Sequence, residues 1–173
     1  NLYKSLKKEL SGTDIKCLAG EEGILEVSQL KVDIMVSAIV GTAGLKPAFN
    51  SLGNTKILAL ANKETIISAG NLLLEKAQSL KTKIIPLDSE HNAIFQVLDK
   101  ENKNNVNNII LTASGGPFLK LPKTKFSNIS INDALRHPNW KMGKKITIDS
   151  ATLINKLLET IEASILFNLE LNN

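Results

Sequence analysis

The sequence predicts an α/β fold with a mostly parallel sheet. Short apolar runs typical of strands alternate with segments whose apolar residues have helical spacing, from residue 15 to residue 98. Strand and helix alternating at this pitch indicate βαβ units, in which helices connect parallel strands. Residues 32–38, Val-Asp-Ile-Met-Val-Ser-Ala, are long and apolar enough to form a buried strand of such a sheet.

The individual elements follow from the spacing of apolar residues. In residues 21–30, for example, apolar side chains recur at helical intervals. We expect strands at residues 15–19, 32–38, 56–61, 83–85, 109–113 and 145–149. We expect helices at residues 21–30, 64–80, 89–98 and 151–169. Polar stretches rich in Asn or Ser predict a solvated loop at residues 100–108 and irregular structure at residues 119–133.

The organisation of the chain changes after Pro86, where the regular alternation gives way to longer loops. We therefore expect two domains, at residues 1–86 and 87–173. Residues 1–10 mix Lys and Leu like the end of an amphipathic helix and lack the features of a signal peptide. The start at Asn1, rather than at Met, leads us to expect further sequence upstream.

The composition excludes several classes of partner. The 173 residues are 43% hydrophobic and 4% aromatic, and no run reaches the roughly 18 apolar residues that a membrane span requires. The formal net charge is +4, but the lysines are scattered and aromatic stacking platforms are absent, so we expect no nucleic-acid partner. Cys17 is the sole cysteine, which excludes a disulfide within the chain and fits a reducing cytoplasm.

Asp88-Ser89-Glu90 follows an expected strand and opens an expected helix. Ligands of parallel sheets bind outside the carboxyl ends of the strands, so two carboxylates here would face a crevice. Carboxylate oxygens suit Mg²⁺ or Mn²⁺. The alternative is ordinary capping, because Asp and Ser are favoured N-caps and acids suit a first helical turn.

The last expected helix carries a second polar cluster. Asn155, Glu159 and Glu162 are four and three positions apart and so share one face, beside Lys156. An amide, carboxylates and an ammonium on one helix are able to bind a metal and a phosphate together. The alternative is a solvated polar face with an ion pair between Lys156 and Glu159, and the residues alone favour neither.

Three further segments contain polar groups at expected turns. Ser114-Gly115-Gly116 ends an expected strand in a tight turn, where backbone N–H groups and a hydroxyl can approach an anion. Ser150 precedes the last expected helix, at an N-cap position. Asn62-Lys63-Glu64 follows the expected strand at residues 56–61, on the ligand-binding edge of the sheet. A plain structural turn or a solvated loop is the alternative for each segment.

The only Trp of the chain lies in an expected loop, in the segment His137-Pro-Asn-Trp140-Lys-Met142-Gly143. An exposed loop with Trp and Met is typical of a lid that closes over a ligand, while a buried structural Trp is the alternative. We expect His91, in the first turn of the helix after Asp88, to be structural.

These segments together resemble the 1-deoxy-D-xylulose 5-phosphate reductoisomerase family along nearly the whole chain. The matching motifs, in chain order, are Ala38-Ile-Val-Gly41 with Ala43-Gly-Leu45, Leu60-Ala-Asn-Lys-Glu64, Pro86-Leu-Asp-Ser-Glu-His-Asn-Ala-Ile-Phe-Gln96, Leu111-Thr-Ala-Ser-Gly-Gly-Pro-Phe118, His137-Pro-Asn-Trp-Lys-Met-Gly143, and Ile148-Asp-Ser-Ala-Thr152 running into Asn155-Lys156.

The resemblance implies the end of a Rossmann-like NADPH-binding domain at residues 1–86 and the start of an α/β catalytic domain at residues 87–173. It implies an NADP-dependent oxidoreductase that converts 1-deoxy-D-xylulose 5-phosphate to 2-C-methyl-D-erythritol 4-phosphate in the non-mevalonate isoprenoid pathway. The implied cofactors are NADPH and a divalent metal, Mg²⁺, Mn²⁺ or Co²⁺. A homodimer in the bacterial cytoplasm is the implied setting.

The resemblance also implies a role for each matching residue. It implies metal ligands at Asp88, Glu90 and Glu159, and catalytic roles for these three, Lys63 and His137. It implies substrate contacts at Lys63, Ser89, Glu90, His137, Trp140 and Glu159, with a phosphate clamp of Ser114, Ser150, Asn155 and Lys156. It implies cofactor contacts at Ala38, Ile39, Val40, Asn62, Glu64, Met142 and Gly143.

Two departures from the family pattern matter. The family has Gly directly after the Asn-Lys pair where this chain has Leu157, which could crowd the phosphate or displace Glu159. The chain also lacks the Gly-rich first turn and the later strands and helices of the family, so we expect it to be inactive by itself. The alternatives are another metal-assisted, NAD(P)-dependent dehydrogenase and a non-catalytic Rossmann-like remnant that binds nucleotide or a partner.

Overall fold

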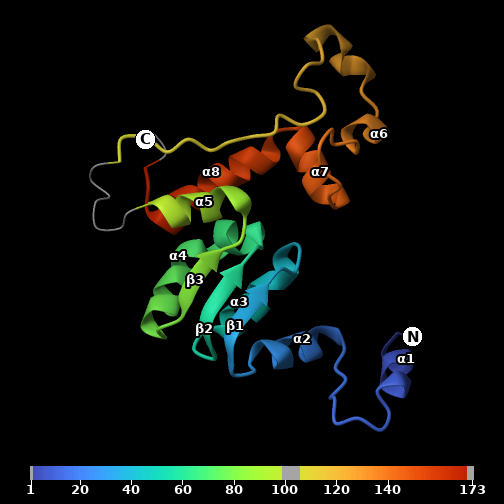
Figure 1. Cartoon of the computed structure of the whole chain (residues 1–173), viewed down its shortest axis with the longest axis vertical. Coiled ribbons are helices and arrows are strands. Elements are labelled where there is room, and N and C mark those ends of the chain that lie inside the picture. The colour runs from blue at the N-terminus through green and yellow to red at the C-terminus, as the bar shows by residue number, and fades with distance from the viewer. Residues whose placement is uncertain (1, 99–105, 171–173) are drawn as a thin grey trace. The chain divides into compact units, whose positions relative to one another are not determined.

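The computed structural model describes residues 2–98 and 106–170 (Figure 1). Contacts between Cα atoms divide the chain into two compact units, Asn1–Leu87 and Asp88–Asn173. Most of the loop expected at residues 100–108 lies outside the described residues. Within the described part of the chain, no helix is both long enough and apolar enough to cross a membrane.

Unit 1 is an α/β unit with a parallel sheet, which confirms the predicted fold class. Its strands are β1 (Val32–Ser37), β2 (Thr55–Leu60) and β3 (Lys83–Pro86), in the order β1-β2-β3. Both pairs are parallel, with Ile34 opposite Ile57 and Leu58 opposite Ile84. The carboxyl ends of the strands therefore meet at one edge of the sheet.

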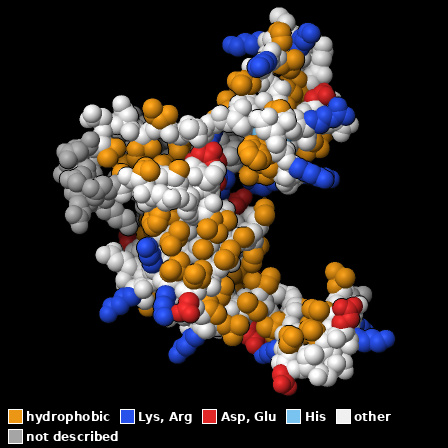
Figure 2. Space-filling model, viewed as in Figure 1, with side chains coloured by type: hydrophobic (Ala, Val, Ile, Leu, Met, Phe, Trp, Pro, Cys, Tyr) orange, Lys and Arg blue, Asp and Glu red, His pale blue; other side chains and the backbone are white. Residues whose placement is uncertain are grey.

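The helices of unit 1 are α1 (Leu2–Glu9), α2 (Gly20–Ser28), α3 (Leu45–Ser51) and α4 (Lys63–Ser79), with a short 3₁₀ turn at Thr42–Gly44. Leu58 of β2 is buried with Ile66 and Leu73 of α4, so one face of the sheet is a packed core. On the opposite face Ile34 and Val36 are exposed, and Figure 2 shows hydrophobic side chains gathered over the strands of unit 1. Parallel sheets normally have both faces covered.

Unit 2 is helical in its described part. It contains α5 (Ser89–Val97), a 3₁₀ segment (Lys123–Asn128), α6 (Ile131–Ala134), α7 (Lys144–Ala151) and α8 (Ile154–Phe167). Its core joins Ile94 of α5 to Ala163 and Phe167 of α8. Partly buried side chains extend this core, namely Phe95, Leu98, Ile109, Leu111, Leu166 and Leu169.

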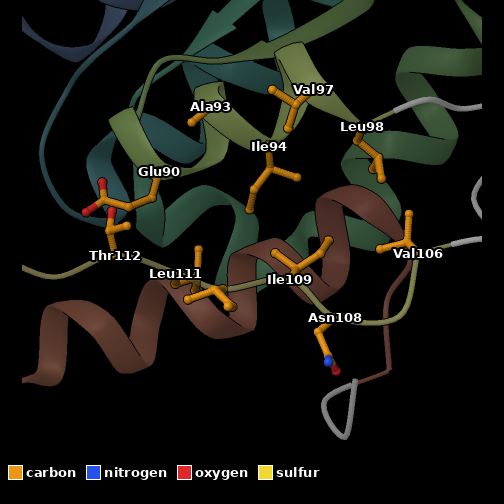
Figure 3. Close-up of a pocket in the computed structure, with 11 residues that line it drawn as sticks. Glu90, Ala93, Ile94, Val97, Leu98, Val106, Asn108, Ile109, Leu111 and Thr112 are labelled. Carbon is orange, nitrogen blue, oxygen red and sulfur yellow. The ribbon is translucent and has the colours of Figure 1, made fainter.

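The strand predicted at residues 109–113 is not formed among the described residues. This segment is extended but pairs with no strand of unit 2, and Ile109 and Leu111 pack instead beside Ile94. The segment and α5 line an apolar cavity of about 340 Å³, with Glu90 at its polar end (Figure 3). The predicted strand is therefore wrong, although Ile109 and Leu111 are partly buried. Residues 15–19, also predicted as a strand, are irregular in the structure.

The strand predicted at residues 145–149 is wrong, because these residues form α7. Local bonds stabilise the helix: Thr147 Oγ1 donates to the carbonyl of Gly143 at 2.8 Å, and Lys145 pairs with Asp149 one turn on at 2.7 Å. Ser150 therefore lies in the last turn of α7. The prediction that it would occupy an N-cap position is wrong. The final helix begins later than expected, at Ile154.

Candidate active site

Three carboxylates meet in unit 2. Asp88 caps α5 and accepts a hydrogen bond from the backbone N–H of Glu90 at 3.3 Å, while Glu159 comes from the middle of α8. One carboxylate oxygen from each of the three lies within 4.8 Å of the others. Ligands across an octahedral Mg²⁺ lie about 4.2 Å apart, so small side-chain rotations would bring these oxygens onto one ion. The chemistry and spacing of the three donors fit a divalent cation.

Lys156 connects these acids to a second polar region. Its ammonium bonds Glu90 Oε1 at 2.8 Å and also pairs with Glu159, one turn along α8. Three carboxylates against this one ammonium leave a net charge of −2, which a divalent ion would balance. Burial alone would raise the pKa of Glu90. Hydrogen bonds from Lys156 and Ser89, with the Lys156 charge, outweigh burial and lower that pKa to about 2.

A buried polar layer lies against the carboxylates. His91 is fully buried, and its Nε2 lies 2.9 Å from the backbone carbonyl of Glu159, which joins α5 to α8. Its Nδ1 lies 3.9 Å from Asp88 Oδ1 and 4.0 Å from Glu162 Oε2. A side chain in this position restrains the backbone that carries Glu159. Sequence reasoning gave His91 no place near the site, although its spacing of three from Asp88 was the available signal.

The predicted phosphate contacts line one small cavity of about 50 Å³. Ser114 and Gly115 come from the turn after the extended segment, Ser150 from α7, and Asn155 and Lys156 from α8. Leu153, which also lines the cavity, has a left-handed backbone (φ 62°) between α7 and α8. Sequence reasoning missed Leu153, because nothing in the sequence marks a leucine for this conformation. The structure thus brings all four members of the predicted clamp together.

Gly116 explains how the Ser114 turn approaches α7. Its φ is +64°, and a Cβ at this position would lie 2.8 Å from the carbonyl oxygen of Ser150. A residue other than Gly would therefore push the turn away from α7. Gly116 thus lets the turn lie against the end of α7, beside the cavity that Ser114, Gly115 and Ser150 line.

His137 joins the expected lid to Ser114. Its Nδ1 accepts hydrogen bonds from the backbone N–H groups of Asn139 and Trp140, at 3.2 and 3.0 Å. In a neutral imidazole the proton is then on Nε2, which donates to Ser114 Oγ at 3.0 Å. This arrangement leaves the Ser114 hydroxyl hydrogen able to donate into the cavity.

Trp140 takes part in these contacts through its backbone N–H. The Trp140 side chain is 65% exposed, so the alternative of a buried structural Trp is wrong for this structure. Met142 is half-buried, and Gly143 is the N-cap of α7. Ser89 is exposed and donates to Glu90 Oε2 at 2.5 Å.

The predicted cofactor residues of unit 1 lie at the carboxyl edge of its sheet. Residues 38–40 follow β1, while Asn62 caps α4 directly after β2. Lys63 and Glu64 are half-buried in the first turn of α4. The Asn62 side chain is buried and bonds the backbone of the loop that follows β1. Two strand ends of unit 1 are thus joined at the edge where parallel sheets bind ligands.

Two family models match adjacent parts of the chain. The model described as 1-deoxy-D-xylulose 5-phosphate reductoisomerase matches residues 1–70, and that of the 1-deoxy-D-xylulose 5-phosphate reductoisomerase C-terminal domain matches residues 84–167. A 1-deoxy-D-xylulose 5-phosphate reductoisomerase from Wolbachia pipientis subsp. Culex pipiens (strain wPip) is 54% identical over 171 residues. The chain belongs to this reductoisomerase family. The match covers 98% of the chain and 44% of the Wolbachia protein.

Solved reductoisomerase structures have the same fold over this length. One, of DOX-P reductoisomerase in complex with NADPH, fosmidomycin and magnesium, gives a TM-score of 0.88 at 41% identity, over 98% of this chain and 45% of that one. Another, the Zymomonas mobilis reductoisomerase in complex with NADPH, also gives 0.88 at 41% identity, over 99% and 44%. The chain therefore spans less than half the length of these reductoisomerases.

Leu157, the departure from the reductoisomerase pattern, is not among the residues that line the cavity of the predicted phosphate contacts. Its side chain is 55% exposed, and its backbone N–H donates to the carbonyl of Leu153 at 3.1 Å. The expected crowding of the cavity is thus not found, and Leu153 is the leucine that borders it.

Proposed function

We propose that the protein carrying this chain is an NADPH-dependent reductoisomerase that converts 1-deoxy-D-xylulose 5-phosphate to 2-C-methyl-D-erythritol 4-phosphate. The observation that supports this most strongly is the convergence of Asp88, Glu90 and Glu159 beside a cavity that Glu90 and Lys156 both line. Carboxylates for a hard cation adjoin donors for a phosphate. A phosphorylated α-hydroxy ketone requires this pairing.

Asp88, Glu90 and Glu159 would hold the divalent ion, Mg²⁺, Mn²⁺ or Co²⁺. When bound, such an ion supplies Lewis-acid polarisation of the substrate oxygens during the rearrangement. Ser89, exposed beside Glu90, would contact the same end of the substrate. Lys63 is proposed as a further contact to the carbonyl end, and His137 as the contact from the lid.

Ser114, Ser150, Asn155 and Lys156 would bind the substrate phosphate. The Ser114 hydroxyl is able to donate because His137 Nε2–H supplies the hydrogen bond that its oxygen accepts. Lys156 brings the positive charge that a phosphate dianion needs. A phosphate fixed in this way orients the reacting carbons, while Trp140 and Met142 would cover the site and exclude water.

NADPH would bind at the carboxyl edge of the sheet in unit 1, with contacts from residues 38–40, Asn62 and Glu64, and from Met142 and Gly143 of unit 2. The support is the position of the unit 1 residues at the strand ends and the NADPH in two similar structures. We further propose a homodimer in a bacterial cytoplasm, in line with the bacterial relatives.

The test is a chimera in which this chain replaces the matching 171 residues of the Wolbachia reductoisomerase. We expect the chimera to oxidise NADPH in the presence of 1-deoxy-D-xylulose 5-phosphate and Mn²⁺, and the chain alone to show no turnover. Glu159→Gln in the chimera should weaken Mn²⁺ binding about 100-fold or more, since one of three charged ligands is lost.

Glu170→Gln is the matched control, because Glu170 is an exposed acid just beyond the same helix. It should leave both Mn²⁺ affinity and turnover unchanged. A folded chimera without turnover would contradict the proposed reaction and favour the non-catalytic alternative. Unchanged Mn²⁺ affinity in Glu159→Gln would contradict the metal assignment.

A further inference from the structure

Asn62 uses all of its side-chain hydrogen-bonding groups inside unit 1. It is 4% exposed, and its Nδ2 donates to the backbone carbonyls of Ile39 and Gly41, the latter at 2.9 Å. Its Oδ1 accepts from the N–H and the hydroxyl of Thr65, at 2.6 and 2.5 Å. A primary amide offers two N–H donors and one oxygen with two lone pairs. Every group of Asn62 therefore has a partner.

Capping of α4 accounts for only one of these four bonds. The bond from the Thr65 N–H to Asn62 Oδ1 is an ordinary N-cap bond, which Ser, Thr or Asp would supply equally well. The two bonds from Nδ2 reach 23 and 21 residues back along the chain, to the loop after β1. Among the favoured caps, only Asn has two donors left for these carbonyls.

The loop after β1 is packed tightly around the Asn62 amide. Gly41 has a φ of +80°, and a Cβ at Gly44 would lie 2.7 Å from the Ile39 carbonyl oxygen and 3.0 Å from Asn62 Nδ2. The N–H of Gly44 donates to the carbonyl of Gly41 at 3.2 Å, which closes the turn. The Val40 side chain, in contrast, is 72% exposed and does not hold the loop. The amide thus restrains the backbone of residues 39–41 at both ends.

We propose that Asn62 is a positioning residue, which holds residues 39–41 in the backbone conformation that receives the nicotinamide cofactor. This inference rests on the NADPH binding proposed above and assigns Asn62 a different part in it. Because the side chain is saturated, any contact from Asn62 itself to the cofactor comes from its backbone. The Asn62 side chain would affect cofactor binding only by holding residues 39–41 in place.

The decisive variant is Asn62→Asp. It retains the oxygen that caps α4 but replaces the two N–H donors by an oxygen, which faces the carbonyls of Ile39 and Gly41. In the chimera, the KM for NADPH should rise about tenfold or more, as expected for two lost bonds, while kcat at saturating NADPH stays within about threefold. Amide hydrogen exchange of residues 41–44 should accelerate, with or without cofactor.

Asn54→Asp is the matched control. Asn54 is also partly buried, and its Nδ2 donates to one backbone carbonyl, that of Asn50, at 3.0 Å, away from the loop after β1. This change should leave the KM for NADPH within twofold and the exchange of residues 41–44 unchanged.

Three outcomes would overturn the inference in distinguishable ways. Unchanged exchange at residues 41–44 in Asn62→Asp would mean that the amide does not hold the loop. Faster exchange with an unchanged KM would mean that the held loop plays no part in cofactor binding. A chimera that does not bind NADPH with Asn62 intact would overturn the proposed function, and with it the cofactor part of this inference.

Discussion

Asn62 in unit 1 and Lys156 in unit 2 each join segments distant in sequence, but with different kinds of bond. Asn62 is buried and bonds only uncharged groups. Lys156 pairs with Glu90 and Glu159, which are the proposed metal ligands. A bound cofactor would leave the Asn62 bonds intact, because they face the protein. A divalent ion would compete with the Lys156 ammonium for the same carboxylates.

The difference teaches that the Asn62 bonds in unit 1 are in place before a cofactor binds. In unit 2, by contrast, Lys156 would have to leave Glu90 and Glu159 when a divalent ion binds. In unit 2 an ion that took Glu90 and Glu159 would release Lys156 toward the small cavity proposed for the phosphate, which Lys156 also lines. Binding of metal and binding of phosphate should therefore favour each other, and by linkage the effect is reciprocal. Three changes in unit 2 test this contrast through one measurement, the affinity for inorganic phosphate.

The largest effect is expected for Lys156→Gln. Phosphate affinity should fall about 10- to 100-fold, since a charge-assisted bond to the anion is lost. Affinity for Mn²⁺ should rise at the same time, because a competing and repelling cation is removed. Titration calorimetry of the chimera measures both. A loss of both affinities would show that Lys156 supports the metal site instead of competing with the ion.

The same variant changes the titration of Glu90. With Lys156 present the pKa of Glu90 is lowered from 4.5 to about 2, so the charged form stabilises the folded chain above pH 4.5. That contribution is lost as the pH falls from 4.5 toward 2. In Lys156→Gln, carboxyl NMR shifts should show a higher Glu90 pKa. Lys145→Gln, which removes an exposed pair with Asp149, is the control and should leave it unchanged.

Sequence reasoning predicted unit 1 better than unit 2, and the reason is physical. In unit 1 three of the four predicted strands had a neighbouring strand with which to pair, so β1, β2 and β3 formed where expected and only residues 15–19 did not. In unit 2 the extended segment at residues 109–113 packs Ile109 and Leu111 beside Ile94 of α5 instead, while Ile110 stays exposed. The β-branched residues of α7 were read as a strand, although local bonds from Thr147 and Lys145 stabilise a helix.

The sequence could suggest site residues only where they lie close together along the chain. Asp88 and Glu90 are two residues apart, and Asn155 and Glu159 lie one helical turn apart, so each pair could be named from the sequence. That the two pairs meet depends on the packing of α5 on α8, which no local pattern specifies. Gly116 was named only as part of a turn, because its contact with Ser150 joins segments far apart in the chain.

Gly116→Ala should have the intermediate effect on phosphate affinity. It tests whether the backbone packing of the Gly116 turn, and not only the charge of Lys156, contributes to phosphate binding. The added Cβ meets the Ser150 carbonyl oxygen, and the positive φ disfavours Ala. We expect a loss of about 2 kcal/mol of unfolding free energy and about tenfold in phosphate affinity. Gly12→Ala is the control: it has a φ of +89° with no atom nearby, so it isolates the backbone cost. Unchanged phosphate affinity in Gly116→Ala would mean that backbone packing does not shape the cavity.

The smallest effect on phosphate is expected for Leu157→Gly, which restores the residue of the family pattern. Leu157 is 55% exposed and does not line the cavity, so phosphate affinity should stay within about twofold. Stability should fall by about 0.5–1 kcal/mol, because Gly in a helix loses more conformational entropy than Leu. Chemical denaturation of the chimera and phosphate titration measure the two quantities. A tenfold gain in phosphate affinity would contradict this and would mean that Leu157 does crowd the bound phosphate. Unchanged phosphate affinity would leave Lys156 and the Gly116 turn as the features of unit 2 that set phosphate binding.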